Sequence, residues 1–440
     1  MTGSTGACER FSNGGAPGGP PERGARVVKE TSGSRILRAA GALAVVAAVG
    51  WLAVSAALVS RAAWVEATDL ESVETLARQL PANVAYDHIL ARAELASGRF
   101  QAAERRLGAA LPRNPLVPAL WLDFARASLA LGQPGRAVAA ASAARDRDPV
   151  SGAVCYDAAV LLFQAGAIEE ALDGLRCAAE FTPGRARDVY DLAWAVLGDG
   201  ERIRRDVVPR SAAGWRGYAS YARAHLREEV SPAWAELARY RPSPSDRLDY
   251  VDFLVRSGRG AEAGEVWAEA YGNRGPNLVF NGSFETESMG RGLDWILGSC
   301  EGARTATVAA RKAPDGERVL EVTFSGSNVA YSHASQFIPV QGGRRYSLKA
   351  FVRSEGVTSL SAPRLTVRGY TGCSMATIAG RELSGTIPWS EERLTFTTPP
   401  ECSVILVQLR RESTKRFDRD ISGRVFVDRV ELTAAEDAQT

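Results

Sequence analysis

The sequence predicts a multidomain chain with three successive parts: a single N-terminal transmembrane helix, an all-α solenoid of repeats and an all-β sandwich. Three observations predict this order. An uncharged apolar stretch covers residues 39–60, a 34-residue periodicity follows it, and a two-residue alternation begins after residue 275. The length of 440 residues suits about three domains.

The composition argues against several functional classes. Hydrophobic residues make up 45% and charged residues 24% of the chain, which is ordinary for globular proteins. The 53 basic residues nearly balance the 51 acidic ones, so no global charge favours nucleic acid. The 3 histidines lie far apart, which argues against a histidine zinc site. Because the GxxxxGK(S/T), HExxH and GxSxG motifs are also absent, we expect a binding protein and not an enzyme.

Residues 36–60 form the predicted transmembrane helix. The stretch from Ala39 to Ser60 has 22 residues without a charge, and about 20 residues are needed to cross the hydrocarbon layer of a bilayer. The alternatives are a cleaved signal peptide and a buried core helix, but the apolar region of a signal peptide is shorter and nearer the N-terminus. Residues 1–34, rich in Gly, Ser, Pro and Thr, are expected to form a disordered cytoplasmic tail.

Basic residues flank the expected span unevenly. Six Lys and Arg residues precede it, whereas the next twenty residues contain only Arg61 and Arg78. The positive-inside rule therefore places the N-terminus in the cytoplasm and the rest of the chain outside it. We expect a single-pass protein of the bacterial inner membrane whose bulk is extracytoplasmic.

Residues 67–273 contain four columns of residues that recur every 34 positions. The columns are Gly98, Gly132 and Gly166; Ala103, Ala137 and Ala171; Ala110, Ala144 and Ala178; and Pro115, Pro149 and Pro183. Glycine ends a helix at a tight turn, and proline ends the following helix. The alanines are small enough to let two helices cross closely.

The period and these residue types resemble the tetratricopeptide repeat (TPR), a pair of antiparallel helices. The resemblance implies three clear repeats and about three degenerate ones, stacked into a solenoid. Gly200 fits the end of the fourth first helix, although Arg205 stands where the family has alanine. The resemblance also implies a concave face, lined mainly by first helices, that binds a protein or peptide.

Cys155 and Cys177 lie at helix ends that should be adjacent in the third repeat. Outside the cytoplasm these two residues can form a disulfide. The alternative is a pair of small buried thiols.

Residues 276–434 predict an antiparallel sandwich. Leu320, Val322 and Phe324 alternate with polar residues, and the same pattern recurs in segments up to Leu432. Turns such as the one at Gln341 separate these segments. About 160 residues with eight or nine strands suit a jelly roll.

This segment resembles carbohydrate-binding modules of the galactose-binding-like jelly-roll group. The similarity lies in the opening residues 277–285 (NLVFNGSFE), in residues 293–295 (LDW) and in the closing residues 425–428 (VFVD). In such modules a structural calcium ion commonly ties the first strand to the last, which implies Glu285 and Asp428 as ligands. Arg429 stands where the family often has a second acidic residue. The alternative is two solvated or hydrogen-bonded carboxylates.

The same resemblance implies a polysaccharide ligand, which would need exposed aromatic faces. The candidates near turns or strand ends are Tyr331, Tyr370, Trp389 and Phe417. The alternative for each is a position in the core or at its rim.

Three cysteines fall in this segment. Cys373 ends one strand segment and Cys402 begins the next but one, so they are the favoured disulfide, and Cys300 remains unpaired.

Two functions follow from this layout. The first is a membrane-anchored extracytoplasmic adaptor, whose solenoid binds a protein partner and whose jelly roll binds a glycan in the bacterial envelope. The second is a non-catalytic assembly scaffold whose jelly roll does not bind sugar. A glycan-cleaving enzyme ranks third, because a glycosidase needs two positioned carboxylates and no stretch marks such a pair.

Overall fold

The computed structural model describes residues 44, 47–50, 69–272 and 275–435. The expected cytoplasmic tail and most of the expected transmembrane helix lie outside these residues; of the expected span, residues 44 and 47–50 are described and are helical. No helix among the described residues is both long enough and apolar enough to cross a membrane. The chain divides into two compact units, Met1–Asn114 and Pro115–Thr440.

The described part of the first unit is helical. Its helices are α2 (Leu70–Gln79), α3 (Val84–Ala96) and α4 (Phe100–Ala110). Asp69 and Asn83 cap the starts of α2 and α3, because their side chains accept hydrogen bonds from backbone amides of the first turn. Gly98 links α3 to α4 with a φ of 72°, in the left-handed region that favours glycine.

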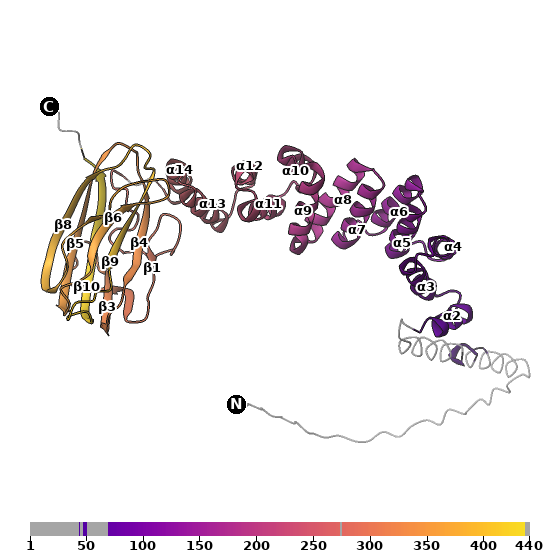
Figure 1. Ribbon diagram of the computed structural model, residues 1–440, viewed down its shortest axis with the longest axis horizontal. Coiled ribbons are helices and arrows are strands. Elements are labelled where there is room, and N and C mark those ends of the chain that lie inside the picture. The colour runs from indigo at the N-terminus through magenta and orange to yellow at the C-terminus, as the bar shows by residue number, and fades with distance from the viewer. Residues whose placement is uncertain (1–43, 45–46, 51–68, 273–274, 436–440) are drawn as a thin grey trace, which may run out of the picture. The chain divides into compact units, whose positions relative to one another are not determined.

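The second unit begins with further helix pairs. These are α5 (Pro118–Ala130) and α6 (Pro134–Arg147), α7 (Gly152–Gln164) and α8 (Ile168–Phe181), α9 (Ala186–Leu197) and α10 (Gly200–Asp206), α11 (Ala212–His225) and α12 (Val230–Ala238), and α13 (Pro244–Arg256) and α14 (Gly260–Tyr271). The two helices of each pair contact each other, and α5, α7, α9 and α11 follow one another as the first helices of adjoining pairs (Figure 1).

The 34-residue columns occupy the positions that the sequence predicts. Gly132 and Gly166 follow α5 and α7 with φ values of 71° and 82°. Ala137 and Ala171, on α6 and α8, are 1% and 0% exposed. A larger side chain there would push the paired helices apart, since protein interiors are close-packed. The predicted TPR-like pairs are therefore confirmed.

The fourth pair differs from the expectation at its turn. Gly200 is the first residue of α10 and does not end the preceding helix. Gly198 ends α9 instead, with a φ of 59°. Asp199 between them accepts hydrogen bonds from the amides of Glu201 and Arg202. The C-cap of α9 at Gly198 and the N-cap of α10 at Asp199 are therefore adjacent. The turn glycine is Gly198, two residues before the expected Gly200.

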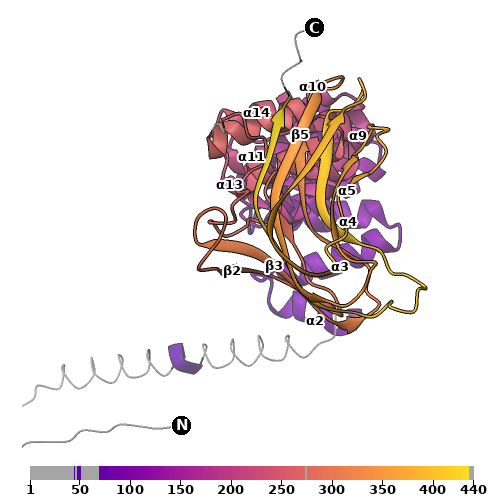
Figure 2. The ribbon, with the colours of Figure 1, turned by 90° about the vertical axis from the view of Figure 1, so that its left-hand side faces the viewer.

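The C-terminal part of the second unit is a sandwich of two antiparallel five-stranded sheets. The first sheet has the order β1-β4-β9-β6-β7 and the second β2-β3-β10-β5-β8. The strands are β1 (Ile296–Leu297), β2 (Ala303–Ala309), β3 (Arg318–Ser327), β4 (Tyr331–Pro339), β5 (Arg345–Val357), β6 (Arg364–Gly369), β7 (Ile378–Ala379), β8 (Gly385–Thr397), β9 (Val404–Arg411) and β10 (Ile421–Ala434). In Figure 2, β3 and β5 of the second sheet lie toward the viewer.

The core of the sandwich follows the predicted alternation. Leu320, Val322 and Phe324 of β3 are at most 2% exposed and pack in one cluster with Leu348 and Val352 of β5. The predicted antiparallel sandwich is thus confirmed. The number of strands is larger than the expected eight or nine. The sequence pattern does not reveal β1 and β7, because each has two residues, too few to show an alternation.

Residues 277–285 lie along β10 without forming a strand. The Leu278 amide donates to the Leu432 carbonyl, and the Val430 amide donates to the Gly282 carbonyl. A Cβ on Gly282 would lie 2.1 Å from the Val430 carbonyl oxygen. This close approach therefore requires glycine.

The last helix pair packs against the sandwich. Trp267 of α14 is fully buried in one apolar cluster with Val251 of α13, Leu293 and Val404. A Cβ added to Gly260, the first residue of α14, would lie 1.9 Å from the Ser403 carbonyl oxygen. We call this contact of α13 and α14 with residues 289–293 and 403–404 the junction.

Candidate functional site

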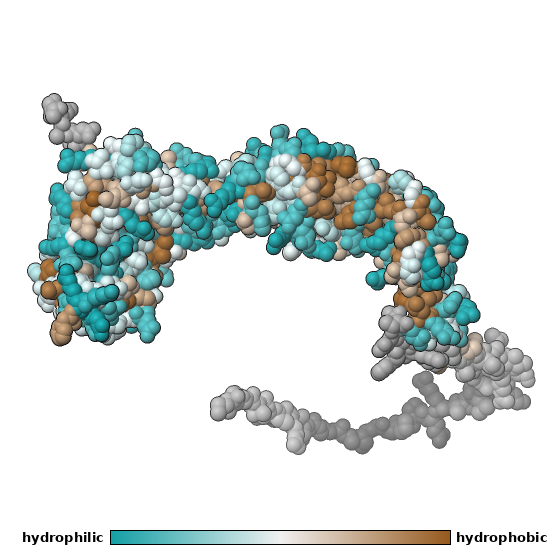
Figure 3. All heavy atoms as spheres, in the orientation of Figure 1, coloured by the Kyte–Doolittle hydropathy of each residue, from teal (hydrophilic) through white to brown (hydrophobic). Residues whose placement is uncertain are grey.

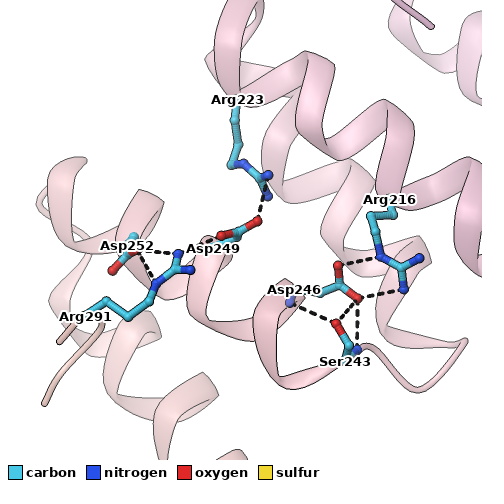
Figure 4. Close-up of polar contacts among 7 residues, drawn as sticks. All are labelled: Arg216, Arg223, Ser243, Asp246, Asp249, Asp252 and Arg291. Carbon is cyan, nitrogen blue, oxygen red and sulfur yellow. Dashed lines mark hydrogen bonds and ion pairs between the residues drawn. The ribbon is translucent and has the colours of Figure 1, made fainter. Parts of the chain in front are cut away.

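A polar network crosses the junction (Figure 4). Arg291, in the loop before β1, donates to Asp252 Oδ2 from Nε at 3.1 Å and from Nη2 at 2.6 Å. Arg291 Nη2 also lies 2.6 Å from Asp249 Oδ1. Arg223 of α11 donates to the other oxygen of Asp249 at 2.9 Å, and the Gly292 amide donates to Asp252 Oδ1 at 2.8 Å. Asp249 therefore connects α11 to the sandwich.

A second ion pair fixes the start of α13 against α11 (Figure 4). Arg216 donates two hydrogen bonds, at 2.7 and 3.0 Å, to the carboxylate of Asp246. Asp246 also forms a capping box with Ser243. Burial by itself would raise the pKa of Asp246, but the hydrogen bonds from Arg216 and Ser243 hold it below its ordinary value. The carboxylate is therefore charged at neutral pH.

A pocket of about 400 Å³ opens between the C-terminal halves of α11 and α13, which are both first helices of their pairs. Its lining includes Ser220, Arg223, Arg227, Phe253, Arg256 and Ser257. Within the described chain, Arg227 and Arg256 form no ion pair with a carboxylate, and Arg223 shares Asp249 with Arg291. The pocket is therefore positively charged.

The outer face of the first sheet carries polar side chains. In β9, Val407 and Leu409 face the sandwich core, so the intervening Gln408 points to the opposite side. Gln408 is 2% exposed, and its side-chain oxygen accepts a hydrogen bond from Arg368 Nε of β6 at 3.1 Å. Thr366, 1% exposed, donates to the Gln408 carbonyl. We call Ser335, Thr366, Arg368 and Gln408, which lie on paired strands, the polar face.

The junction covers one end of this sheet. Tyr370, directly after β6, packs its ring against Phe337 of β4 with 4.5 Å between ring centroids. Both residues contact the apolar cluster around Trp267. Tyr370 is therefore engaged in the junction and does not present a free ring to a sugar.

The other aromatic candidates lie apart from one another. Tyr331 is 1% exposed in the core, where burial raises the pKa of its hydroxyl to about 12; its selection as a glycan platform is wrong, because the start of β4 turns it inward. Trp389 lies on the second sheet, 6.4 Å from the ring of Phe426. Phe417 is fully exposed in the loop between β9 and β10. The structure does not bring the four candidates together.

The two predicted calcium ligands face the same loop. The Glu285 carboxylate accepts hydrogen bonds from the amides of Glu317 and Arg318 at 2.9 and 2.8 Å. Asp428 Oδ2 accepts one from the Asp315 amide at 2.9 Å. Asp428 lies at a β-bulge, where the register of β10 against β5 shifts between residues 428 and 431.

The charge state of Asp428 reflects this position. The side chain is fully buried, and burial together with the nearby charges of Asp315 and Glu285 raises its pKa to about 6. Carboxylate oxygens are the type of ligand that a hard cation such as calcium prefers. No group of three or more His, Cys, Asp or Glu residues in the described ranges is arranged to hold a metal ion.

The structure contains two disulfides. Cys155 pairs with Cys177 inside the third repeat, with 5.8 Å between their Cα atoms. Cys373 pairs with Cys402 between the ends of β6 and β9, with 4.3 Å between Cα atoms. The latter is the pair that the sequence favours. Cys300 is the free cysteine among the described residues and is partly buried.

The sequence analysis missed the polar face and the network at the junction. A signal for the polar face existed, because Arg364, Thr366 and Arg368 alternate along β6 with the apolar Leu365 and Val367. No local pattern marks the network, since Arg291 and its partner Asp252 are 39 residues apart.

Comparisons with known proteins agree with this architecture. Residues 94–150 match the family model of the tetratricopeptide repeat. The tRNA nuclease WapA of Bacillus subtilis strain 168 is 25% identical over 208 residues, covering 43% of this chain and 8% of that protein. The tRNA3(Ser)-specific nuclease WapA of Bacillus spizizenii is 24% identical over the same shares. The chain thus spans a small part of these relatives.

Several solved structures are similar in parts. A family 4 carbohydrate-binding module is 13% identical, with 36% of this chain and 99% of that chain covered and a TM-score of 0.26. A family 61 module in complex with β-1,4-galactotriose is 18% identical over 37% of this chain and all of that chain, with a TM-score of 0.23. PilF of Pseudomonas aeruginosa is 17% identical over 43% and 91%, with a TM-score of 0.24. The chain contains a TPR region and a C-terminal β-sandwich that resembles carbohydrate-binding modules.

Proposed function

We propose that this chain is a membrane-anchored extracytoplasmic adaptor of the bacterial envelope. Its TPR solenoid binds a protein partner, its sandwich binds a glycan, and it catalyses no reaction. The polar face is the observation that carries the glycan proposal. Gln408 points away from the sandwich core but is nearly inaccessible to solvent, so it supports Arg368, the half-buried member of the polar face that reaches the outer surface.

The chemistry of the polar face suits sugar hydroxyls. The partly exposed guanidinium of Arg368 supplies hydrogen-bond donors to sugar oxygens. The hydrogen bond to the buried Gln408 holds this guanidinium in one orientation. A few fixed polar groups on a rigid sheet are the arrangement that gives a small-ligand site its specificity.

The helical repeats supply surface for a protein partner. Large apolar side chains are exposed at Leu116 (75%), Val150 (63%) and Phe181 (44%). Leu116 and Val150 each follow the proline of a repeat, so they recur at the 34-residue period. On the side of the molecule shown in Figure 3, apolar residues gather over α7 and α8. Apolar residues gathered on a protein surface commonly mark an interaction site.

The proposed compartment and anchor come from two observations. Disulfides persist in oxidising compartments, and the pairs Cys155–Cys177 and Cys373–Cys402 suit a place outside the cytoplasm. The uncharged stretch at residues 39–60 supplies the anchor in this proposal.

A structural calcium ion is part of the proposal. Glu285 and Asp428 are the residues that would hold it, and backbone carbonyl oxygens would complete its coordination shell. The ion would offset the effects of burial and of the nearby charges of Asp315 and Glu285, which raise the pKa of Asp428. Glu285 and Asp428 already hold the loop at residues 315–318 against β10 through backbone amides.

Glycan-array screening of the full-length chain tests the glycan proposal. We expect binding to at least one polysaccharide, and Arg368→Ala should weaken that binding about tenfold, since a fixed charge-assisted hydrogen bond is lost. The control is Arg393→Ala on the second sheet, which removes an exposed arginine paired with Glu391. Absence of any bound glycan, or equal loss in the control, contradicts the proposal.

The second candidate is a non-catalytic assembly scaffold whose sandwich binds no sugar. The junction favours it, because Phe337, Tyr370 and Val404 use one end of the first sheet to contact the helices. In this role the sandwich covers the end of the solenoid. A chain that captures a protein partner but no glycan supports it, whereas turnover of a bound glycan indicates an enzyme.

A further inference from the structure

The pocket between α11 and α13 has a charge that the chain itself does not neutralise. Arg223 and Arg291 are balanced by Asp249 and Asp252 in the network of Figure 4. Arg256 donates only to the backbone carbonyl of Asp252, one turn earlier in its own helix. Arg227 has no carboxylate partner in the described chain. Two guanidinium groups therefore remain available beside Arg223.

We infer that this pocket binds acidic side chains of a protein partner, and that this binding is coupled to the junction through Asp249. The inference rests on the proposed protein-binding role of the solenoid and names the chemistry of its ligand. Guanidinium groups form paired hydrogen bonds with carboxylates. Ser220 and Ser257 add hydroxyl groups, and the half-buried Phe253 offers apolar surface to the stems of the acidic side chains.

The coupling follows from the position of Asp249. Its two oxygens are divided between Arg223, on the pocket side, and Arg291, on the sandwich side. An acidic ligand competes with Asp249 for Arg223. When Arg223 turns to the ligand, Arg291 loses a neighbouring like charge and keeps Asp249 for itself. Occupation of the pocket should therefore strengthen the contact of Arg291 with α13. Because coupling is reciprocal, a more stable junction should in turn raise the affinity of the pocket for its ligand.

The direct test is fluorescence anisotropy with the full-length chain and a labelled hexaglutamate peptide. We expect hexaglutamate to bind and hexaglutamine not to bind. The double variant Arg227→Gln/Arg256→Gln should weaken binding by about tenfold or more. The matched control is Arg187→Gln/Arg239→Gln, which removes the same charge from exposed arginines outside the pocket. Equal loss in both variants means nonspecific attraction and overturns the inference.

Two competition experiments distinguish an acidic peptide from other anionic ligands. Inorganic phosphate and oligogalacturonate are each added to the complex with hexaglutamate. Weak displacement by both supports a peptide ligand. Tighter binding of phosphate or of the acidic sugar than of hexaglutamate overturns the assignment to a protein partner. Failure of the peptide alone leaves partner binding elsewhere on the solenoid intact, so it refutes the pocket without refuting the adaptor role.

Hydrogen exchange tests the coupling. The Gly292 amide donates to Asp252 within the network, so exchange of residues 290–293 reports the state of the junction. Saturating hexaglutamate should slow this exchange in the wild type. In Arg223→Gln the peptide still meets Arg227 and Arg256, but the exchange should no longer respond. An unchanged wild-type rate, or a response that persists in the variant, refutes the coupling.

Discussion

The free energy of unfolding of the sandwich should fall as the pH rises, because of the buried carboxyl group of Asp428. The perturbation is a change from pH 4 to pH 7 in buffers that have been freed of calcium beforehand, so that no calcium is bound. Asp428 is fully buried, and its pKa in the folded protein is raised from 3.8 to about 6. Because the folded state binds the proton more tightly than the unfolded state, protonation favours folding.

The magnitude follows from the two pKa values. Each tenfold change in proton affinity corresponds to about 1.4 kcal/mol, so the rise to about 6 corresponds to about 3 kcal/mol. This stabilisation is fully present below about pH 4 and is lost as the pH rises through about 6. The folded sandwich should therefore be less stable at pH 7 than at pH 4 by this amount from Asp428 alone.

Urea unfolding measures the effect, with hydrogen exchange of β10 peptides to separate the sandwich from the helical repeats. Asp428→Asn should remove the slope, whereas Asp420→Asn, an exposed carboxylate of the same domain, should keep it. Calcium binds the deprotonated carboxylate, so its stabilising effect should grow with pH, to about 2.7 kcal/mol at a hundredfold excess over the Kd. Equal slopes in wild type and Asp428→Asn would refute the reasoning, and no effect of calcium would remove the metal from the proposal.

Three further predictions concern the rest of the chain. Ala137→Leu or Ala171→Leu should overpack a helix pair and lower the free energy of unfolding by about 1–3 kcal/mol; unchanged melting temperatures would contradict the proposed register. The Cys373–Cys402 disulfide closes a loop with a sequence separation of 29, so its removal should cost about 3–4 kcal/mol in the entropic model. Non-reducing peptide mapping should recover these two cysteines in one linked peptide, and Cys300 in that linkage would count against the pairing. A reporter active only in the cytoplasm should stay inactive when fused to the C-terminus, and its activity would reverse the expected topology.

The sequence predicts the helical pairs well because their contacts are local and periodic. The glycine and alanine columns at a 34-residue spacing, such as Gly132 and Ala137, report backbone conformation and helix contact directly. The degenerate fourth pair is harder, since Gly198 and Gly200 both fit the end of a helix and only the cap at Asp199 separates them. The sandwich is likewise visible in the alternation of β3 and β5.

The candidate sites are less visible, because they depend on contacts between distant residues. Aromatic residues near turns, such as Tyr331, were a poor guide to a surface, since position near a turn does not tell which side of a strand faces the core. The run VILVQL in β9 is apolar on both faces, and Gln408 is its only polar residue. The network around Asp249 joins three segments that no local spacing relates.

The pairing of residues 277–285 with β10 has a consequence for the order of folding. The side chain of Asn277 accepts a hydrogen bond from the Leu432 amide across 155 residues, so the sandwich cannot close before its last strand has left the ribosome. The helix pairs need only neighbouring residues and can form earlier, since local contacts form fastest. During synthesis the surface of Trp267 on α14 therefore stays exposed until β9 supplies Val404, and exposed apolar surface of this kind is prone to aggregation.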